Sequence, residues 1–385
     1  MRWNWQPSQT VFLDFETQSA ASLPEVGSYR YLTDPSTRVM SIVLRVDGVS
    51  YVYVPSYAYP RSLEHLDLGH PVTWLHDDAG PWLEELTRTH TFVAHNAEGF
   101  DALVWERLVA VGDPAWYDTV PACRAGGYPG SLDGAAFAMF GERKDSAGSK
   151  AMKMLTRAKM RAGTPVYPQG TEHLWRDMLR YNVVDVLLLE RIYHETLEFG
   201  EADVLDAHVA VNARGIAVDL GFLARLKGVW SELEHYALTR VMELVPGLDS
   251  PSAALAFLRS GPRMHKWLRS MGLHMETLER KHVEQMYEEP EEFFAEADFG
   301  NAPTVVEVLK LRQTATRAGR GKLEAIEDRL EPDGRVRRLL RYYGAHTGRW
   351  SGSGIQPQNF ARPTKGVDVE RLVKSPTLSL EEVLR

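Results

Sequence analysis

The stretch VFLDFETQS, residues 11–19, places two carboxylates inside an otherwise apolar run. The β-branched and aromatic residues around them predict a strand, in which the side chains of Asp14 and Glu16, two positions apart, point from the same face. Two like charges side by side in a half-buried place are unfavourable unless a positive group lies between them. A metal ion is a candidate for that group, and the motif by itself is short.

The first hundred residues read as strands interspersed with short helices, which predicts a mixed α/β sheet domain. The predicted strands are TVFLDFET (10–17), RVMSIVLRVDG (38–48), SYVYVP (50–55), VTWLH (72–76) and TFVAHN (91–96), and the predicted helices are GPWLEELTR (80–88) and FDALVWERLVAV (100–111). Further along, the pattern predicts a long helix over 171–200 that ends at Gly200, a mainly helical region over 221–340, and a loop over 341–363.

The composition is that of a globular chain of 385 residues, with 44% hydrophobic and 25% charged residues. No apolar stretch approaches the length of a membrane span, and the N-terminus lacks the apolar core of a secretory signal. The single cysteine, Cys123, excludes an internal disulfide framework and a cysteine-rich zinc site. We expect Cys123 to be an inert buried residue in a reducing compartment.

Charge is segregated along the chain, although the net charge is −8. Residues 284–298 carry seven acids and no Lys or Arg, whereas residues 310–322 and residues 335–349 each carry five bases and no acid. One such run is usually a solvated face, but two basic runs close together in an acidic chain favour a surface that binds phosphates.

Two more acids occupy positions where sequence logic expects apolar or tightly shaped surroundings. Asp101 opens a predicted helix, where interaction with the helix dipole is a sufficient explanation. Asp185 lies one turn after Tyr181 among apolar neighbours, so burial is predicted, and a buried unpaired acid is costly. Oxygen-only ligands favour Mg²⁺ or Mn²⁺, and two such ions roughly 4 Å apart can hold a phosphodiester during hydrolysis. The Tyr181 phenol would then orient the attacking water.

The motifs DFE (14–16), HNAEGFD (95–101) and YNVVD (181–185) resemble, in order and spacing, the three exonuclease motifs of the DEDD superfamily in its Tyr-bearing branch. This resemblance implies a ribonuclease H-like fold and 3′→5′ hydrolysis of DNA or RNA by two metal ions. It implies that Asp14, Glu16, Asp101 and Asp185 are metal ligands, that Tyr181 orients water and that Asn96 contacts the strand being cut. His95 is expected to make a structural hydrogen bond.

Two stretches in the second half resemble family A DNA polymerases, namely DAHVAVNARGIAVD (206–219) and HTGRWSGSGIQPQNFARP (346–363), and GERKDSAGSKAM (141–152) is similar to phage members of that family. In the second stretch glycine permits a close approach to a phosphate, and an arginine supplies a forked donor. The expected DNA-binding residues are Arg312, Arg317, Arg320 and Lys322 in the first basic run and Thr347, Arg349, Gln358 and Asn359 in the motif itself.

The resemblance implies an α/β exonuclease domain over 1–203, a mainly helical thumb-like domain over 204–340 and the start of a palm over 341–385. After the Gln-Asn pair the sequence holds a single Asp, Asp368, and no polymerase acid motif. We therefore expect that the chain alone does not add nucleotides, and that it is truncated or works with a second chain that supplies palm and fingers.

The expected partners are the single-stranded 3′ end and the primer–template duplex of DNA, in the bacterial cytoplasm if the chain is phage-encoded. Two alternatives stay open at this point. One is a non-catalytic subunit that binds DNA and assembles with a polymerase, and the other is an exonuclease that trims RNA.

Overall fold

The computed structural model describes residues 1–59, 62–143, 146–156, 159–161, 164–166, 171–196, 201–273, 275–294, 296–316, 319–360 and 368–378. The chain forms two compact units. Unit 1 comprises Met1–Ala217 and Ala325–Phe360, and unit 2 comprises Val218–Glu324 and Ala361–Arg385. These divisions differ from the expected boundaries after residues 203 and 340, since residues 204–217 and the whole second basic run, residues 335–349, belong to unit 1.

A seven-stranded mixed sheet forms the centre of unit 1, with the strand order β1-β7-β6-β2-β3-β4-β5. Its strands are β1 (Arg2–Trp3), β2 (Thr10–Gln18), β3 (Arg38–Val46), β4 (Val49–Tyr53), β5 (Thr73–Leu75), β6 (Thr91–Ala94) and β7 (Ala115–Asp118). β2 pairs antiparallel with β3 and parallel with β6, so it lies in the interior of the sheet. The predicted strands and the mixed α/β class are confirmed.

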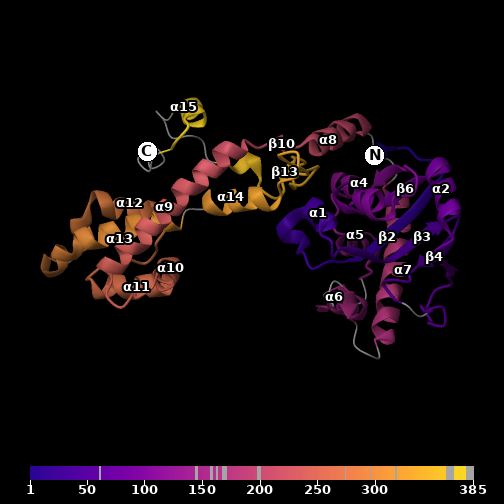
Figure 1. Cartoon of the computed structure of the whole chain (residues 1–385), viewed down its shortest axis with the longest axis horizontal. Helices are drawn as coiled ribbons and strands as arrows, with labels where there is room; N and C mark the ends of the chain where they lie inside the picture. The colour runs from indigo at the N-terminus through magenta and orange to yellow at the C-terminus, as the bar shows by residue number, and fades with distance from the viewer. Residues whose placement is uncertain are drawn as a thin grey trace. The chain divides into compact units, whose positions relative to one another are not determined.

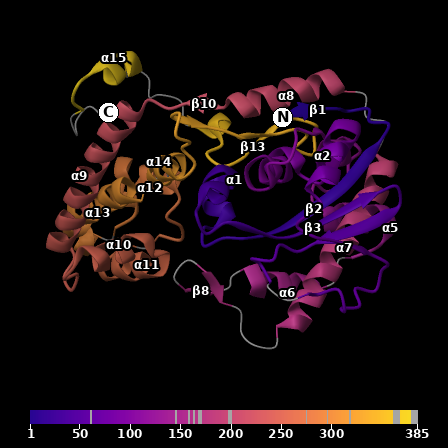
Figure 2. The same ribbon diagram turned by 45° about the vertical axis from the view of Figure 1, so that its right-hand side comes forward.

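Both faces of the sheet are covered by helices, as the alternation of side chains along each strand requires. Phe12 of β2 packs with α5 (Leu132–Phe140), α6 (Ser146–Thr156) and α7 (Glu172–Glu195) in one core. Leu13 and Phe15 pack on the other face with α1 (Leu23–Thr33), α2 (Gly80–Thr89) and α3 (Ala102–Val104). Figure 2 shows α1 and α2 on one side of β2 and β3, and α6 and α7 on the other.

The long predicted helix is α7, and it ends earlier than expected. Its last residue is Glu195, with Thr196 in the C-cap position, whereas the predicted cap Gly200 lies outside the described residues. The buried side chains of α7 form one face that packs on the sheet, and Asp185 is among them at 3% exposure. The predicted burial of Asp185 is confirmed.

The other elements of unit 1 lie around this sandwich. They are the π-helical turns η1 (Ala97–Asp101) and η2 (Trp105–Val109), α4 (Thr119–Ala125), the hairpin β8 (Lys159–Arg161) and β9 (Thr164–Val166), α8 (Ala202–Arg214), β10 (Ile216–Ala217), β11 (Arg335–Val336), β12 (Leu340–Arg341), β13 (Ser351–Gly352) and the short turn η5 (Pro357–Asn359). β10 pairs with β11, and β12 pairs with β13. Most of residues 341–363 is loop, as predicted, with β13 and η5 as short exceptions.

Unit 2 is helical, as the pattern predicts. Its elements are α9 (Leu220–Leu244), α10 (Pro251–Arg259), α11 (Gly261–Ser270), α12 (Arg280–Glu288), the short turns η3 (Pro290–Glu292) and η4 (Glu296–Asn301), α13 (Ala302–Ala315), the first half of α14 (Gly319–Asp328) and α15 (Val369–Lys374). A core that includes Val241, Leu258 and Val308 joins α9, α10 and α13 (Figure 1). Across the described residues, no helix combines the length and apolar character that a membrane span requires.

Candidate active site

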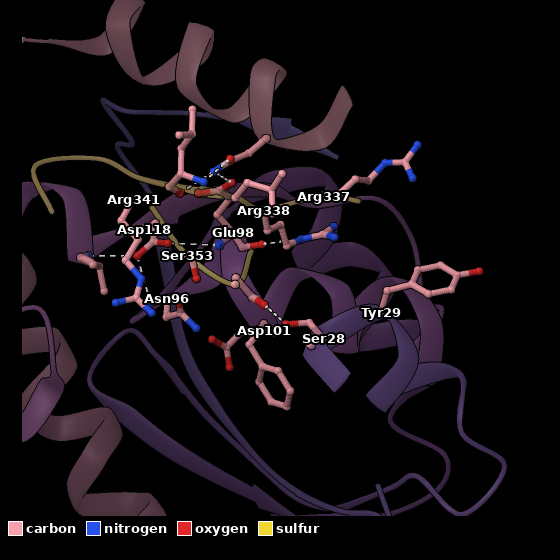
Figure 3. Close-up of a pocket in the computed structure, with 18 of the residues that line it drawn as sticks. Ser28, Tyr29, Asn96, Glu98, Asp101, Asp118, Arg337, Arg338, Arg341 and Ser353 are labelled. Atoms are coloured by element: carbon pink, nitrogen blue, oxygen red, sulfur yellow. Dashed lines mark hydrogen bonds between the residues drawn. The ribbon is translucent and has the colours of Figure 1, made fainter. Parts of the chain in front are cut away.

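A pocket of about 590 Å³ lies in unit 1, between the sheet, the turn η1 and the returning segment 329–354. Asp14 and Asp101 line it together with Asn96 and Asp118. Five arginines also line it, and four of them come from the returning segment: Arg124, Arg329, Arg337, Arg338 and Arg341. Figure 3 shows acidic and basic side chains around the same space. The pocket is thus suited to a ligand that carries both phosphates and bound cations.

Asp14 points from β2 toward α7. Its Oδ2 accepts a hydrogen bond of 2.7 Å from Nδ2 of Asn182, a side chain with no exposed surface. Phe12, two residues earlier on the same strand face, packs edge-on against Tyr193 of α7. The alternation of the strand therefore sends Asp14 to the face that α7 covers, and Asn182 fixes the orientation of its carboxylate.

Asp101 closes the turn η1 and is 4% exposed. Burial raises the pKa of its carboxyl well above the usual range, and the charges of Asp14 and Asp118 raise it further. Asp14 and Asp101, two of the predicted metal ligands from elements far apart in sequence, are therefore close enough for their charges to repel each other. A bound cation would relieve this repulsion.

Asp118 is a site residue that the sequence reasoning missed. It ends β7, caps α4, and accepts hydrogen bonds from the backbone N–H groups of Asn96 (2.9 Å), Glu98 (3.1 Å) and Val120 (2.9 Å). Burial raises its pKa to about 6, although these hydrogen bonds favour the charged form. The signal in the sequence is Asp118-Thr119 after an aromatic strand, an N-cap pattern. Asp118 thus holds the loop that carries Asn96 and Asp101.

The loop between β6 and η1 has a strained start. Asn96 adopts a left-handed backbone conformation with φ 85°, and its side-chain amide lies over Gly99, where a Cβ would come within 2.4 Å of Oδ1. His95 makes hydrogen bonds with Oγ1 of Thr119 (2.8 Å) and the carbonyl oxygen of Gly130 (3.2 Å). The structural hydrogen bond expected for His95 is confirmed.

The remaining predicted catalytic residues lie near Asp14 rather than in the pocket wall. Asp185 follows Asn182 by one turn on the buried face of α7, and Tyr181 is half-buried on the same helix beside Asn182. Glu16 is 8% exposed at the point where the pairing of β2 with β3 shifts register. The pocket therefore exposes Asp14 and Asp101 to a ligand, whereas Glu16 and Asp185 are buried outside its lining.

The donor set of the site fits a hard divalent cation, because it consists of carboxylate oxygens whose mutual repulsion raises the pKa of Asp101. The side chains are not, however, preassembled around an ion. Among the residues that the structure describes, no group of three or more His, Cys, Asp or Glu side chains is arranged to hold a metal. In this arrangement Oδ2 of Asp14 accepts a hydrogen bond from Asn182. Binding of an ion would require the carboxylates to rotate toward it.

The returning segment 329–354 forms one part of the pocket wall, and residues 95–101, called here the acidic loop, form another. Glu98 and Asn212 connect the two. Nδ2 of Asn212 donates to Oε1 of Glu98 (2.7 Å) and to the carbonyl oxygen of Leu340 (2.9 Å), while Oδ1 of Asn212 accepts from the Leu340 N–H (3.0 Å). His208 lies 3.2 Å from Oε2 of Glu98. Asn212 and His208 are each 2% exposed. This buried network ties the segment that carries Arg338 and Arg341 to the loop of Asp101.

The residues expected to bind DNA outside the nuclease motifs are scattered. In unit 2, Nε of Arg312 donates to the carbonyl oxygen of Leu258 (3.0 Å), so part of this guanidinium is used within the unit. In unit 1, four of these residues lie at exposed loop or turn positions: Thr347, Arg349, Gln358 and Asn359. Lys322 is half-buried, whereas Arg317 and the side chain of Arg320 lie outside the described residues.

Comparison with known proteins places the chain near DNA polymerases. No family model matches it. It is 26% identical over 364 residues to a DNA polymerase of Bacillus phage SP02, an alignment that covers 91% of this chain and 51% of that polymerase. The chain thus spans about half the length of the curated relative it matches. Among solved structures it is similar to the POL domain of Pol1 from M. smegmatis in complex with a DNA primer-template and dNTP, with a TM-score of 0.44 and 14% identity over 96% of this chain and 55% of that one.

Proposed function

We propose that this chain is a nuclease that removes nucleotides from the 3′ ends of DNA, as part of a DNA polymerase-like protein. The similarity to a phage DNA polymerase supports the polymerase relationship. The order of the three acidic motifs along the chain supports the nuclease assignment and the ribonuclease H-like fold. The motifs lie on the strand β2, the turn η1 and the helix α7. The two-ion mechanism belongs to the same proposal.

The observation that carries the proposal is the joint lining of one pocket by Asp14, Asp101 and five arginines. A purely structural acid pair would be neutralised by a direct ion pair with a neighbouring base, yet the pKa of Asp101 is raised. Arginines that line the same pocket as these acids suit a nucleic acid strand, because its phosphates bind cationic side chains and its hydrolysis uses metal ions held by carboxylates.

The ligands for Mg²⁺ or Mn²⁺ would be Asp14, Glu16, Asp101 and Asp185. When bound, these ions supply Lewis-acid stabilisation of the charge that develops on phosphate oxygens. The chain's own groups position the reactants around them. Asn182 holds the carboxylate of Asp14, and Tyr181, one turn before Asp185, orients the attacking water through its phenol.

The strand is held by groups that do not react. Asn96, whose strained backbone lies in the pocket wall, contacts the nucleotide that is to be removed. Asp118 keeps that position through its hydrogen bond from the Asn96 N–H. Rigid placement of this kind lowers the entropy lost when the strand reaches the reactive geometry.

The test is hydrolysis of a 5′-labelled single-stranded DNA in Mg²⁺ or Mn²⁺ by the whole chain. We expect stepwise shortening from the 3′ end, a loss of at least about 100-fold in Asp185→Ala, and a loss on the order of 10²-fold in Tyr181→Phe with DNA binding retained. Asp203→Ala removes an exposed acid of α8 and serves as the matched control.

Other outcomes would overturn parts of the proposal. Binding of DNA without shortening by the unmutated chain would indicate a non-catalytic assembly subunit. Faster shortening of an RNA of the same sequence would indicate RNA trimming. A primer-extension assay on the same preparation examines the expected need for a second polymerase chain, which efficient synthesis by this chain alone would contradict.

A further inference from the structure

We propose that Arg124 and Arg341 together form a binding site for an internucleotide phosphate of the strand that enters the nuclease pocket. This inference rests on the proposed function and names how its substrate is recognised. The two guanidiniums come from α4 and β12, which are more than two hundred residues apart in sequence. Both side chains line the pocket that holds Asp14 and Asp101.

The other three arginines of the pocket are already engaged by protein groups. Arg337 makes hydrogen bonds with Asp333 (2.5 Å) and Glu331 (2.8 Å). Arg338 lies 3.6 Å from Glu331 and donates to the carbonyl oxygen of Glu98. Arg329 donates to two backbone carbonyl oxygens, those of Pro24 (2.8 Å) and Ala325 (3.4 Å). These three arginines hold the wall of the pocket together.

Arg124 and Arg341 retain most of their donors. Arg124 is half-buried, and within the described part of the chain its guanidinium makes one hydrogen bond, of 3.3 Å, to the carbonyl oxygen of Tyr342. Arg341 lines the pocket and is exposed, and its guanidinium makes no hydrogen bond or ion pair with any of the residues that the structure describes. Each guanidinium has five N–H donors, so most of this capacity is available to a ligand.

The two cations are close enough to disfavour each other. Burial lowers the pKa of Arg124, and the charge of Arg341 lowers it further, while Asp118 acts in the opposite sense. Two like charges held together beside a cavity are stabilised by an anion between them. A phosphodiester fits, because its two free oxygens match the forked donors of arginine.

Both arginines are held by rigid supports rather than by flexible loops. Arg341 pairs with Ser351 in the β12–β13 ladder. The residue before it, Leu340, is fixed through both its N–H and its carbonyl oxygen by Asn212. Arg124 lies on the helix that Asp118 caps. Because the backbone at both positions is already ordered, binding of a phosphate requires ordering of the two side chains but of no loop.

The phosphate bound here is a neighbour of the one that is hydrolysed. Asp101 and Arg341 lie in different parts of the pocket wall (Figure 3). The bond that is cut must lie at Asp14 and Asp101, so the arginine pair binds a linkage upstream of the 3′ terminus. The substrate class is therefore a strand with at least one internucleotide phosphate beyond the scissile bond.

The experiment is a series of single-stranded DNA oligonucleotides, each with one methylphosphonate that removes the charge of a single linkage. Binding is measured by fluorescence anisotropy in EDTA, and shortening is measured under single-turnover conditions in Mg²⁺. For the unmutated chain we expect one upstream linkage at which the methylphosphonate weakens binding about tenfold, equivalent to about 1.4 kcal/mol. Arg341→Gln and Arg124→Gln should each show that loss with ordinary DNA, and no further loss at that linkage.

The matched control is Arg88→Gln, which removes an exposed arginine of α2 that pairs with Glu85. It should respond to the methylphosphonates as the unmutated chain does. Each pocket variant should also reduce the slope of log affinity against log salt by about 0.7, the value for one phosphate contact on a single strand.

The readouts separate this inference from the proposed function. Additive losses from Arg341→Gln and from every methylphosphonate would overturn the phosphate site even if the chain shortens DNA normally. Non-additive losses in anisotropy, from a chain that never shortens DNA, would support the phosphate site and overturn the nuclease. If neither arginine variant changes binding, the inference is wrong.

Discussion

Replacement of Asn212 by alanine removes the central link between the acidic loop and the returning segment. The side chain makes two hydrogen bonds with the backbone of Leu340 and one with the carboxylate of Glu98, all between 2.7 and 3.0 Å. Two bonds between neutral groups and one to a charged group together contribute about 4 kcal/mol, from about 0.5–1.5 and 1.5–3 kcal/mol respectively. Because Asn212 is 2% exposed, water replaces these bonds poorly.

The measurement is urea unfolding of the whole chain, followed by tryptophan fluorescence. Unit 1 contributes buried tryptophans such as Trp105 and Trp116, and unit 2 contributes Trp267, which packs against its core. Asn301→Ala provides a comparison, since among the described residues the side chain of Asn301 makes one hydrogen bond, of 3.1 Å, to the carbonyl oxygen of Met271. We expect about 4 kcal/mol of lost stability for Asn212→Ala and about 1 kcal/mol for Asn301→Ala. Equal losses for the two variants would show that the network does not hold the segment.

Three further predictions concern single residues. Cys123 is fully buried and burial raises its pKa to about 12, so its labelling by a disulfide reagent at pH 8 should be at least about 100-fold slower in the folded chain than in denaturant. Burial raises the pKa of Asp118 from 3.8 to about 6, so the folded state binds more protons than the unfolded state between these two pH values. The free energy of unfolding of the unmutated chain, measured relative to that of Asp118→Asn, should therefore be larger at pH 5 than at pH 7. Gly215→Ala should lower the melting temperature, because φ is +63° and the new Cβ would lie 2.4 Å from the Val336 carbonyl oxygen, at a cost of about 2 kcal/mol or more; Gly228→Ala, in open space on α9, should not.

The sheet and the long helix were predictable because their patterns are local. Alternation in β2 and β3 and the apolar face of α7 follow from two periodicities that the sequence displays directly. The burial of Asp185 followed from its apolar neighbours. The end of α7 did not, because Gly200 suggested a cap and the helix stops at Glu195.

The presence of the returning segment in the pocket of Asp14 and Asp101 was not predictable, because it depends on contacts between distant segments. In the sequence, Arg338 and Arg341 belong to a basic run that crosses the expected boundary between the thumb-like domain and the palm. In the structure, Asn212 brings this run beside the acidic loop. Asp118 was not predicted for a different reason. A lone acid at a helix N-cap is explained by the cap itself, and its hydrogen bond from the Asn96 N–H joins residues that are distant in sequence.

The discontinuity of unit 1 has a consequence for the integrity of the molecule. Ala325–Phe360 is joined to the first 217 residues by noncovalent contacts, among them the pairing of β10 with β11 and the bond from Arg329 to Pro24. A protease that cuts the backbone once between residues 218 and 324 would therefore leave a nicked protein whose two fragments elute together from a native column and separate only in denaturant. The arginines of the returning segment would stay in the pocket with Asp14 and Asp101, because noncovalent contacts within unit 1 hold them there.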